Sequence, residues 1–173
     1  MPAVVNLKKP STRYADKFLL AVRLSRSLNR GLVSPPADYL AYEQYVKSNR
    51  RVNRMGFLVV TADTSDLVGV INVSEIVRGT FQSAYLGYYA FVPFNGRGLM
   101  FQGLRQVIRH CFVELKLHRL EANIQPENAR SIALVEALGF RKEGVSPRYL
   151  KVCGEWRDHE RWAILAEDWP GAA

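Results

Sequence analysis

The sequence predicts an α/β (α+β) fold in which helices pack on one mixed sheet. The centre of the chain carries three runs of β-branched and aromatic residues divided by short turn sequences, which is typical of an antiparallel meander. Stretches with apolar residues at helical spacing come before and after this centre. A doubly wound parallel sheet would instead alternate strands and helices along its whole length.

Size and composition suit a single domain, residues 1–173. A chain of 173 residues, 48% of them hydrophobic, buries enough surface to need no disulfide or metal. Its two cysteines, Cys111 and Cys153, match no disulfide or metal spacing. The N-terminus lacks the apolar core of a signal peptide, and no run is long and apolar enough to span a membrane. We therefore expect a cytoplasmic protein with no membrane contact, either a monomer or a homodimer.

The first part of the chain is expected to form one strand and two helices. Val4–Lys8 has the composition of a short strand. Residues 14–31 place apolar side chains at helical spacing and end in an Asn-Arg-Gly stop signal. The sequence "LVSPP" that follows favours an extended loop, because proline restricts itself and the residue before it. A second helix is predicted over residues 38–53.

The centre and the C-terminal half are predicted to form strands, two helices and a final hairpin. Strands are expected over residues 56–63, 67–77 and 83–92, with Pro93 ending the third. A long helix follows Gly98, because its apolar residues fall on one stripe. The rest is predicted as a strand, a helix stopped by a glycine, and a hairpin; these span residues 119–125, 126–140 and 146–165.

The junction between the third central strand and the long helix has the sequence "NGRGLM", residues 95–100. A helix start carries unpaired amides and the positive end of the helix dipole, and glycine lets an anion approach the backbone. Together these features favour a phosphate site. The pattern is neither a P-loop nor a dinucleotide fingerprint, and a two-glycine turn alone is also compatible with a purely structural role.

Several ordered motifs give the chain a family resemblance. "NGRGLM", "HRLEANIQPENARSIALVEALGFRKEG", "NVSEIVRGTFQSAYLGYY" and "YLKVCGEWRDH" together resemble the GNAT acetyltransferases over residues 68–165. Within that family they resemble the RimJ/RimL-type ribosomal-protein N-terminal (alanine) acetyltransferases, RimJ most of all. The resemblance implies the GNAT fold, with a twisted, mostly antiparallel sheet flanked by helices. It also implies acetyl transfer from acetyl-CoA to a primary amine.

The resemblance also implies the residues that hold the cofactor. The strand before the turn would hydrogen-bond the pantetheine arm, and the turn amides would bind the pyrophosphate. The strand residues are Ala90, Phe91 and Val92, and the turn residues are Asn95, Gly96, Arg97, Gly98, Leu99 and Met100. Asn95 and Met100 depart from the family pattern, which prefers Gln or Arg and Gly or Ala at these positions. Because the backbone does the binding, these side chains alone do not remove the site.

Catalysis needs a neutral amine, a donor for the oxygen that becomes negative, and a proton for the departing sulfur. A backbone amide near Phe91 is the expected oxygen donor. By resemblance, Ser131 would lie near the sulfur and Asn128 would hold the cofactor arm, although Asn128 also suits a helix N-cap. The family's glutamate base falls on Asn123, which would orient a water or the substrate. Glu121, two residues away, is the alternative base.

Other polar and aromatic residues are weaker candidates for the chemistry. Glu75 is a second alternative base, and Asp158 is expected to orient a substrate amine if it has a role. Tyrosines on the central strands are more typical of packing than of acid catalysis. They are Tyr85, Tyr88 and Tyr89, with Tyr149 on the final hairpin. The histidines, His159 among them, have no spacing typical of a metal site.

The acceptor is left open between classes. The chain has 24 basic and 16 acidic residues, a net charge of +8, which favours an anionic partner. The first hypothesis is acetylation of a protein N-terminus, for example that of a ribosomal protein. The alternatives are a small amine, a non-catalytic nucleic-acid or ribosome-binding module, and a CoA sensor without turnover. No known nucleic-acid-binding motif is present, so no direct nucleic-acid role is expected.

Overall fold

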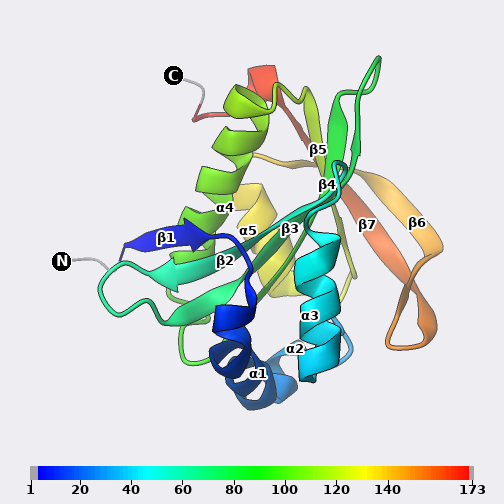
Figure 1. Ribbon diagram of the computed structural model, residues 1–173. Helices are drawn as coiled ribbons and strands as arrows, with labels where there is room; N and C mark the ends of the chain where they lie inside the picture. The colour runs from blue at the N-terminus through cyan, green and yellow to red at the C-terminus, as the bar shows by residue number, and fades with distance from the viewer. Residues whose placement is uncertain (1–3, 172–173) are drawn as a thin grey trace.

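The computed structural model describes residues 4–171, which form one seven-stranded sheet in the order β1-β2-β3-β4-β5-β7-β6 (Figure 1). Only the pairing of β4 with β5 is parallel, and every other neighbouring pair is antiparallel. The mixed sheet predicted from the sequence is therefore confirmed. The strands are β1 Val5–Lys8, β2 Met55–Thr61, β3 Leu67–Val77, β4 Ser83–Ala90, β5 Arg119–Ile124, β6 Arg141–Val152 and β7 Glu155–Leu165.

Helices cover both faces of the sheet (Figure 1). The α-helices are α1 Ala15–Leu24, α2 Arg26–Asn29, α3 Tyr39–Ser48, α4 Leu99–Arg109 and α5 Ala129–Ala137. Short 3₁₀ turns lie at Thr12–Tyr14 and Ala166–Asp168, and a π-helical turn, His110–Glu114, continues α4. The predicted hairpin is present and turns at Cys153 and Gly154, between β6 and β7.

Two hydrophobic cores lie on opposite faces of the sheet, as the alternation along β2 shows. Leu58 and Val60 pack with side chains of α1 and α3, whereas Val59 between them packs with side chains of α4. All three are fully buried, and each contributes about 1.5–3 kcal/mol through burial. The sheet thus separates an α1–α3 face from an α4–α5 face.

Two predicted helices differ from the observed ones. The helix predicted over residues 14–31 is interrupted at Ser25, whose hydroxyl accepts a hydrogen bond from the Val92 amide, 2.9 Å away. The helix predicted over residues 38–53 is too long and ends at Ser48. There the Asn49 side chain and the Ser48 hydroxyl both donate to the Tyr45 carbonyl, each at 2.8 Å, and turns follow.

Strands β4 and β5 separate soon after they meet. They pair over three residues only, from Ser83 opposite Arg119 to Tyr85 opposite Glu121. Beyond Tyr85, β4 remains paired with β3 as far as Ala90, and β5 remains paired with β7 as far as Ile124. The two strands therefore diverge at the centre of the sheet, and the end of β4 is left without a neighbour on its β5 side.

Candidate active site

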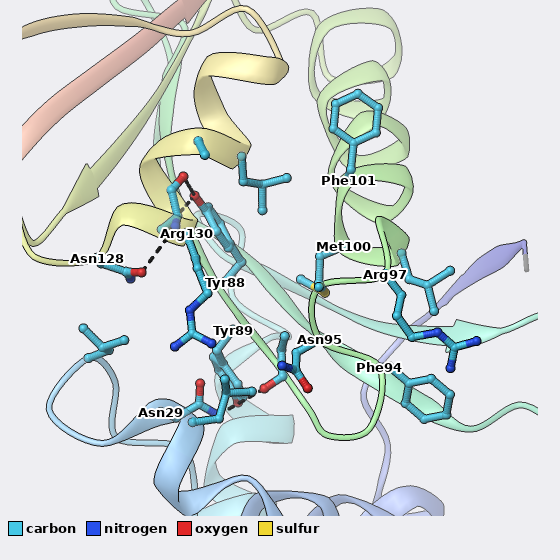
Figure 2. A pocket seen from close by; sticks show the side chains of 18 of the residues that line it. Asn29, Tyr88, Tyr89, Phe94, Asn95, Arg97, Met100, Phe101, Asn128 and Arg130 are labelled. Carbon is cyan, nitrogen blue, oxygen red and sulfur yellow. Dashed lines mark hydrogen bonds between the residues drawn. The ribbon is translucent and has the colours of Figure 1, made fainter.

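A cavity of about 390 Å³ lies where β4 diverges from β5 (Figure 2). Its walls come from the end of β4, the turn over residues 94–98, the first turns of α4 and α5, and the end of α2. The lining includes the tyrosines and leucines of these elements together with two arginines, Arg97 and Arg130. The cavity is therefore apolar in its walls and positively charged at two positions.

The N-terminus of α4 opens toward this cavity without a side-chain cap. The N-cap residue is Gly98, which has φ +73° and makes no side-chain capping hydrogen bond. Gly96 has φ +74°, and a Cβ placed on either glycine would meet no atom within 4 Å. The first N–H groups of a helix have no partner within the helix and carry the positive end of its dipole. The turn thus offers accessible donors to an anion.

The larger side chains at this turn pack against neighbouring residues. Leu99 and Met100 are buried in the core of the α4–α5 face. Met100 also fills the space over Gly69 of β3, where an added Cβ would lie 2.5 Å from the Met100 sulfur. The Arg97 guanidinium lies over the Phe94 ring, 5.8 Å from its centroid. Gly96 and Gly98 thus leave the backbone uncovered in the cavity lining, beside the side chains of Arg97 and Met100.

The N-terminus of α5 also lines the cavity, but it is capped by its own sequence. Asn128 Oδ1 accepts a hydrogen bond from the Ser131 amide, 3.2 Å away. The Ser131 hydroxyl lies 2.6 Å from the Tyr88 hydroxyl, so Asn128 and Tyr88 both contact Ser131. Figure 2 labels Asn128 and Tyr88. Burial raises the pKa of Tyr88 to about 12, so its phenol stays protonated well into alkaline solution.

Tyr88 is a site residue that sequence reasoning treated as packing. The available signal was its position in β4, where it shares a face with Leu86 and Ala90 and so points toward α4 and α5. Its neighbour Tyr89 packs on the opposite face, with α1 and α3. Alternation alone indicates which tyrosine faces the helices after the turn, but not that one of them meets a serine.

Two polar residues of the first helices hold the end of β4. The Val92 amide donates to the Ser25 hydroxyl, and Asn29 Nδ2 donates to the Ala90 carbonyl at 3.1 Å. Both side chains are buried. They follow Phe18 and Val22 at spacings of three and four residues, so they are polar positions on an apolar helical stripe. That pattern was the signal in the sequence, and it was missed.

The backbone groups expected to hold the cofactor arm are only partly accessible. The Phe91 amide donates to the Val68 carbonyl at 2.8 Å, and the Val92 amide is taken by Ser25. Because hydrogen bonds alternate along an antiparallel pair, the Phe91 bond to β3 places the Tyr88 and Ala90 amides on the other side, toward the gap. The amide near Phe91 that faces the gap is thus that of Ala90, because the Phe91 amide is already bonded to Val68.

The two predicted base candidates on β5 do not line this cavity. Arg119 Nε donates to Glu121 at 2.9 Å, and the same guanidinium pairs with Glu143, whose pKa it lowers. Asn123 Oδ1 is buried and has no hydrogen-bond partner among residues 4–171. Asn123 lies opposite Arg161 of β7 in the sheet register. Glu121 is thus engaged in an ion pair, while Asn123 has a spare acceptor.

The remaining weak candidates lie outside the cavity lining. Glu75 is exposed at an irregularity of β3, with φ +49°. Asp158 accepts a hydrogen bond from the Arg148 amide at 2.7 Å, and buried His159 lies against Tyr149. Among the described residues, no cluster of three His, Cys, Asp or Glu side chains is arranged to hold a metal. None of the helices in this part of the chain is long and apolar enough to cross a membrane.

Comparison with known proteins adds independent information. The model of a family described as acetyltransferase (GNAT) domain matches residues 6–141. The chain is 40% identical over 112 residues to the probable N-acetyltransferase YjcK of Bacillus subtilis, which covers 65% of this chain and 62% of that protein. It is 44% identical over 110 residues to the [ribosomal protein uS5]-alanine N-acetyltransferase of Escherichia coli, covering 63% and 57%. The matched segments thus span about three fifths of the length of these relatives.

A solved structure resembles the whole chain. The Mycobacterium smegmatis RimJ in complex with CoA-disulfide superposes with a TM-score of 0.86 at 28% identity, and the match covers 98% of this chain and 88% of that one. The similarity therefore extends through β6 and β7, beyond the residues that the family model matches.

Proposed function

The chain belongs to the acetyltransferase (GNAT) domain family, and on that premise we propose that it transfers the acetyl group of acetyl-CoA to the N-terminal α-amino group of a protein. A ribosomal protein is the proposed acceptor, in line with the printed name of the Escherichia coli relative. One observation carries the proposal: the uncapped start of α4 opens, through Gly96 and Gly98, onto a cavity at the divergence of β4 and β5.

The residues present fit acetyl-CoA. Its diphosphate would accept hydrogen bonds from the amides between Gly96 and Met100, where a helix N-terminus favours negative charge. Arg97 and Arg130 border the same cavity and add positive charge. The Tyr88 amide, which faces the gap, would donate a hydrogen bond to a carbonyl of the pantetheine arm. When bound, acetyl-CoA supplies the thioester that is cleaved.

Ser131 would donate a proton to the departing sulfur. The Tyr88 and Ser131 hydroxyls lie 2.6 Å apart, and either can donate the hydrogen bond between them. In the proposed arrangement Tyr88 donates to the Ser131 oxygen. That bond leaves the Ser131 proton directed elsewhere. The amide bond to Asn128 fixes the Ser131 backbone at the start of α5. Ser131 is thus positioned from both sides, while Asn128 serves as the N-cap beside the cofactor arm.

Deprotonation of the acceptor needs little assistance. A peptide α-amino group has a pKa of about 7.7–8.0, so a substantial fraction is neutral near physiological pH. The unpaired Oδ1 of Asn123 would orient the amine or a water that accepts its proton. Glu121 would act as base only after leaving its ion pair with Arg119, so its role is secondary in this proposal. The Ala90 amide would stabilise the negative oxygen.

A combined assay tests the proposal. Purified protein is incubated with acetyl-CoA and peptides that begin with Ala or Ser, or with a panel of small amines. CoA-thiol release and mass spectrometry follow acetylation. We expect acetylation of the peptide α-amine. Turnover restricted to small amines would show that the acceptor is a small amine and not a protein N-terminus. CoA binding without turnover on any amine would overturn the catalytic proposal. Salt-sensitive RNA binding without CoA affinity would favour a binding module instead.

A further inference from the structure

A second cavity, of about 650 Å³, lies beside the first one. It is enclosed by α1, α2, the loop over residues 31–37 and the tip of the β6–β7 hairpin. Asn29 and Val33 line both cavities, so the two meet at the end of β4, where Asn29 binds the Ala90 carbonyl. The hairpin tip reaches this loop, since Cys153 Sγ lies 3.4 Å from the Ser34 hydroxyl. An acceptor in the second cavity would therefore lie next to the end of β4, beside the first cavity.

The lining of the second cavity is cationic. Arg23, Arg26 and Arg30 contribute to it, and none of them forms an ion pair with another residue of the described chain. Its one carboxylate, Asp16, accepts a hydrogen bond from the Tyr39 hydroxyl. The nearest acidic residue on the hairpin tip, Glu155, pairs with Arg157. The cavity consequently presents three arginine charges against the single carboxylate of Asp16, so its lining is positive on balance.

Arg23 and Arg26 lie in the last turns of α1 and α2, where positive charge is favourable, and Arg30 follows α2. All three are exposed and line one cavity, so their like charges repel one another. The repulsion is relieved when an anionic group lies between them, and guanidinium groups bind carboxylates in a matching two-pronged geometry. Cationic acceptors, polyamines among them, would instead be repelled.

We propose that the second cavity binds acidic side chains that directly follow the acceptor's α-amino group, so that the enzyme prefers peptides with Asp or Glu after the first residue. The inference rests on the proposed function and adds the chemical class of its acceptor. The acceptor's α-amine would pass Asn29 toward the end of β4, while its carboxylates stay among Arg23, Arg26 and Arg30. The selectivity is electrostatic, so it weakens as salt is added.

The test uses three Ser-initiated peptides that differ only at the positions after the serine, which carry Asp and Glu, Asn and Gln, or Lys. With the wild-type protein at low ionic strength, we expect kcat/KM to be about tenfold higher for the acidic than for the neutral peptide, and lowest for the basic one. The difference should lie in KM for the peptide and shrink with added salt. KM for acetyl-CoA should not change between peptides.

Reversing the charge of the arginines tests whether they cause the preference for acidic peptides. The double variant Arg23→Glu/Arg26→Glu should lose the acidic preference and accept the basic peptide better. The control Arg51→Glu changes an exposed arginine outside both cavities and should keep the wild-type order. Thermal melts show whether each variant is folded. Arg30→Gln, which removes a charge without reversing it, provides a second measurement if the double variant is unstable.

The outcomes separate the two proposals. Equal kcat/KM for acidic and neutral peptides, with turnover intact, would overturn the acidic-acceptor inference and leave the proposed function standing. Failure to acetylate any peptide would overturn the proposed function itself. If the double variant lost binding of an RNA oligonucleotide while its peptide preference stayed as in the wild type, the arginines would be a nucleic-acid surface, and the inference would be wrong.

Discussion

Two helix N-termini border the same cavity, and only one of them has a side-chain cap. At α5, the Asn128 side chain accepts a hydrogen bond from the Ser131 amide, so the helix caps itself. At α4, the N-cap is Gly98 in a left-handed conformation, with no side-chain cap. Glycine in place of a side-chain cap costs a helix only about a few tenths of a kcal/mol, so the start of α4 remains uncapped at a small loss of stability.

The presence or absence of a side-chain cap suits the two helix N-termini to different roles. An uncapped helix start keeps its amides available, which suits recognition of an anion by the backbone. A capped start has its donors engaged, but it holds the residue behind the cap in a defined place, and here that residue is Ser131. In the proposed reaction the α4 terminus thus binds an anion, and the α5 terminus positions the Ser131 side chain against Tyr88.

The largest effect is expected from closing the open terminus with a negative charge. Gly98→Glu should lower acetyl-CoA affinity by at least about 100-fold, since two unit charges 4 Å apart repel by about 4 kcal/mol at an intermediate dielectric. An added Cβ would meet no atom within 4 Å, so the fold should persist apart from the strain of a positive φ. Calorimetric titration with acetyl-CoA measures the change.

Gly79→Glu is the matched control. Gly79 has φ +70° with no atom within 4 Å of an added Cβ, so the same substitution carries the same strain far from the cavity. It should bind acetyl-CoA as the wild type does. If Gly98→Glu also bound normally, the diphosphate would not lie on this turn.

The next largest effect concerns the positioned serine. Ser131→Ala should lower kcat by about 10–100-fold, the low end for loss of a proton donor, because a thiol is already a good leaving group. KM for acetyl-CoA should change little, because the Asn128 cap uses the Ser131 amide and not its hydroxyl. Steady-state kinetics at varied acetyl-CoA separate the two parameters.

Two further variants make that result specific. Tyr88→Phe should reduce kcat in the same direction by less, and the double variant should cost no more than Ser131→Ala, because both changes act on one hydrogen bond. Ser131→Thr keeps the hydroxyl and should restore part of the rate. An equal loss of acetyl-CoA affinity in Ser131→Ala would make Ser131 a binding residue instead.

Much of the difference between the N-termini of α4 and α5 could be predicted from the sequence, because neighbouring residues determine how each helix starts. The glycines around Arg97 mark a turn that needs positive φ, and Asn128 precedes a helical stretch. The hairpin turn at Cys153 and Gly154 is likewise encoded by neighbouring residues.

The features that sequence reasoning missed depend on contacts between distant segments. Ser25 and Tyr88 meet partners 67 and 43 residues away, and nothing in their own neighbourhood identifies those partners. The pairing that engages the Phe91 amide is likewise set by the register of β3 and β4. Glu121 is the exception, because its ion-pair partner, Arg119, is two residues away and was visible in the sequence.

A smaller effect should appear in alkaline solution. Burial raises the pKa of Tyr88 from 10 to about 12, so above pH 10 the unfolded chain loses a proton that the folded chain retains. The folded state is therefore destabilised as the pH rises from about 10 to 12, by at most about 1.4 kcal/mol per pH unit for this residue. Chemical unfolding of Tyr88→Phe over this range should show a shallower decline than the wild type. An identical slope would contradict a buried, protonated Tyr88.

The smallest effect tests the capped terminus. Asn128→Ala should lower the free energy of unfolding by about 1 kcal/mol or less, because the Ser131 amide loses its side-chain acceptor and keeps only the carbonyl of residue 128. Asn128→Asp keeps an acceptor and should retain stability, yet it places a carboxylate beside the cavity and should weaken acetyl-CoA binding. Urea unfolding and calorimetry distinguish the two variants. If Asn128→Ala lowered acetyl-CoA affinity as strongly as Gly98→Glu without any loss of stability, then α5, like α4, would serve to bind the cofactor, and the division of tasks between the two termini would be wrong.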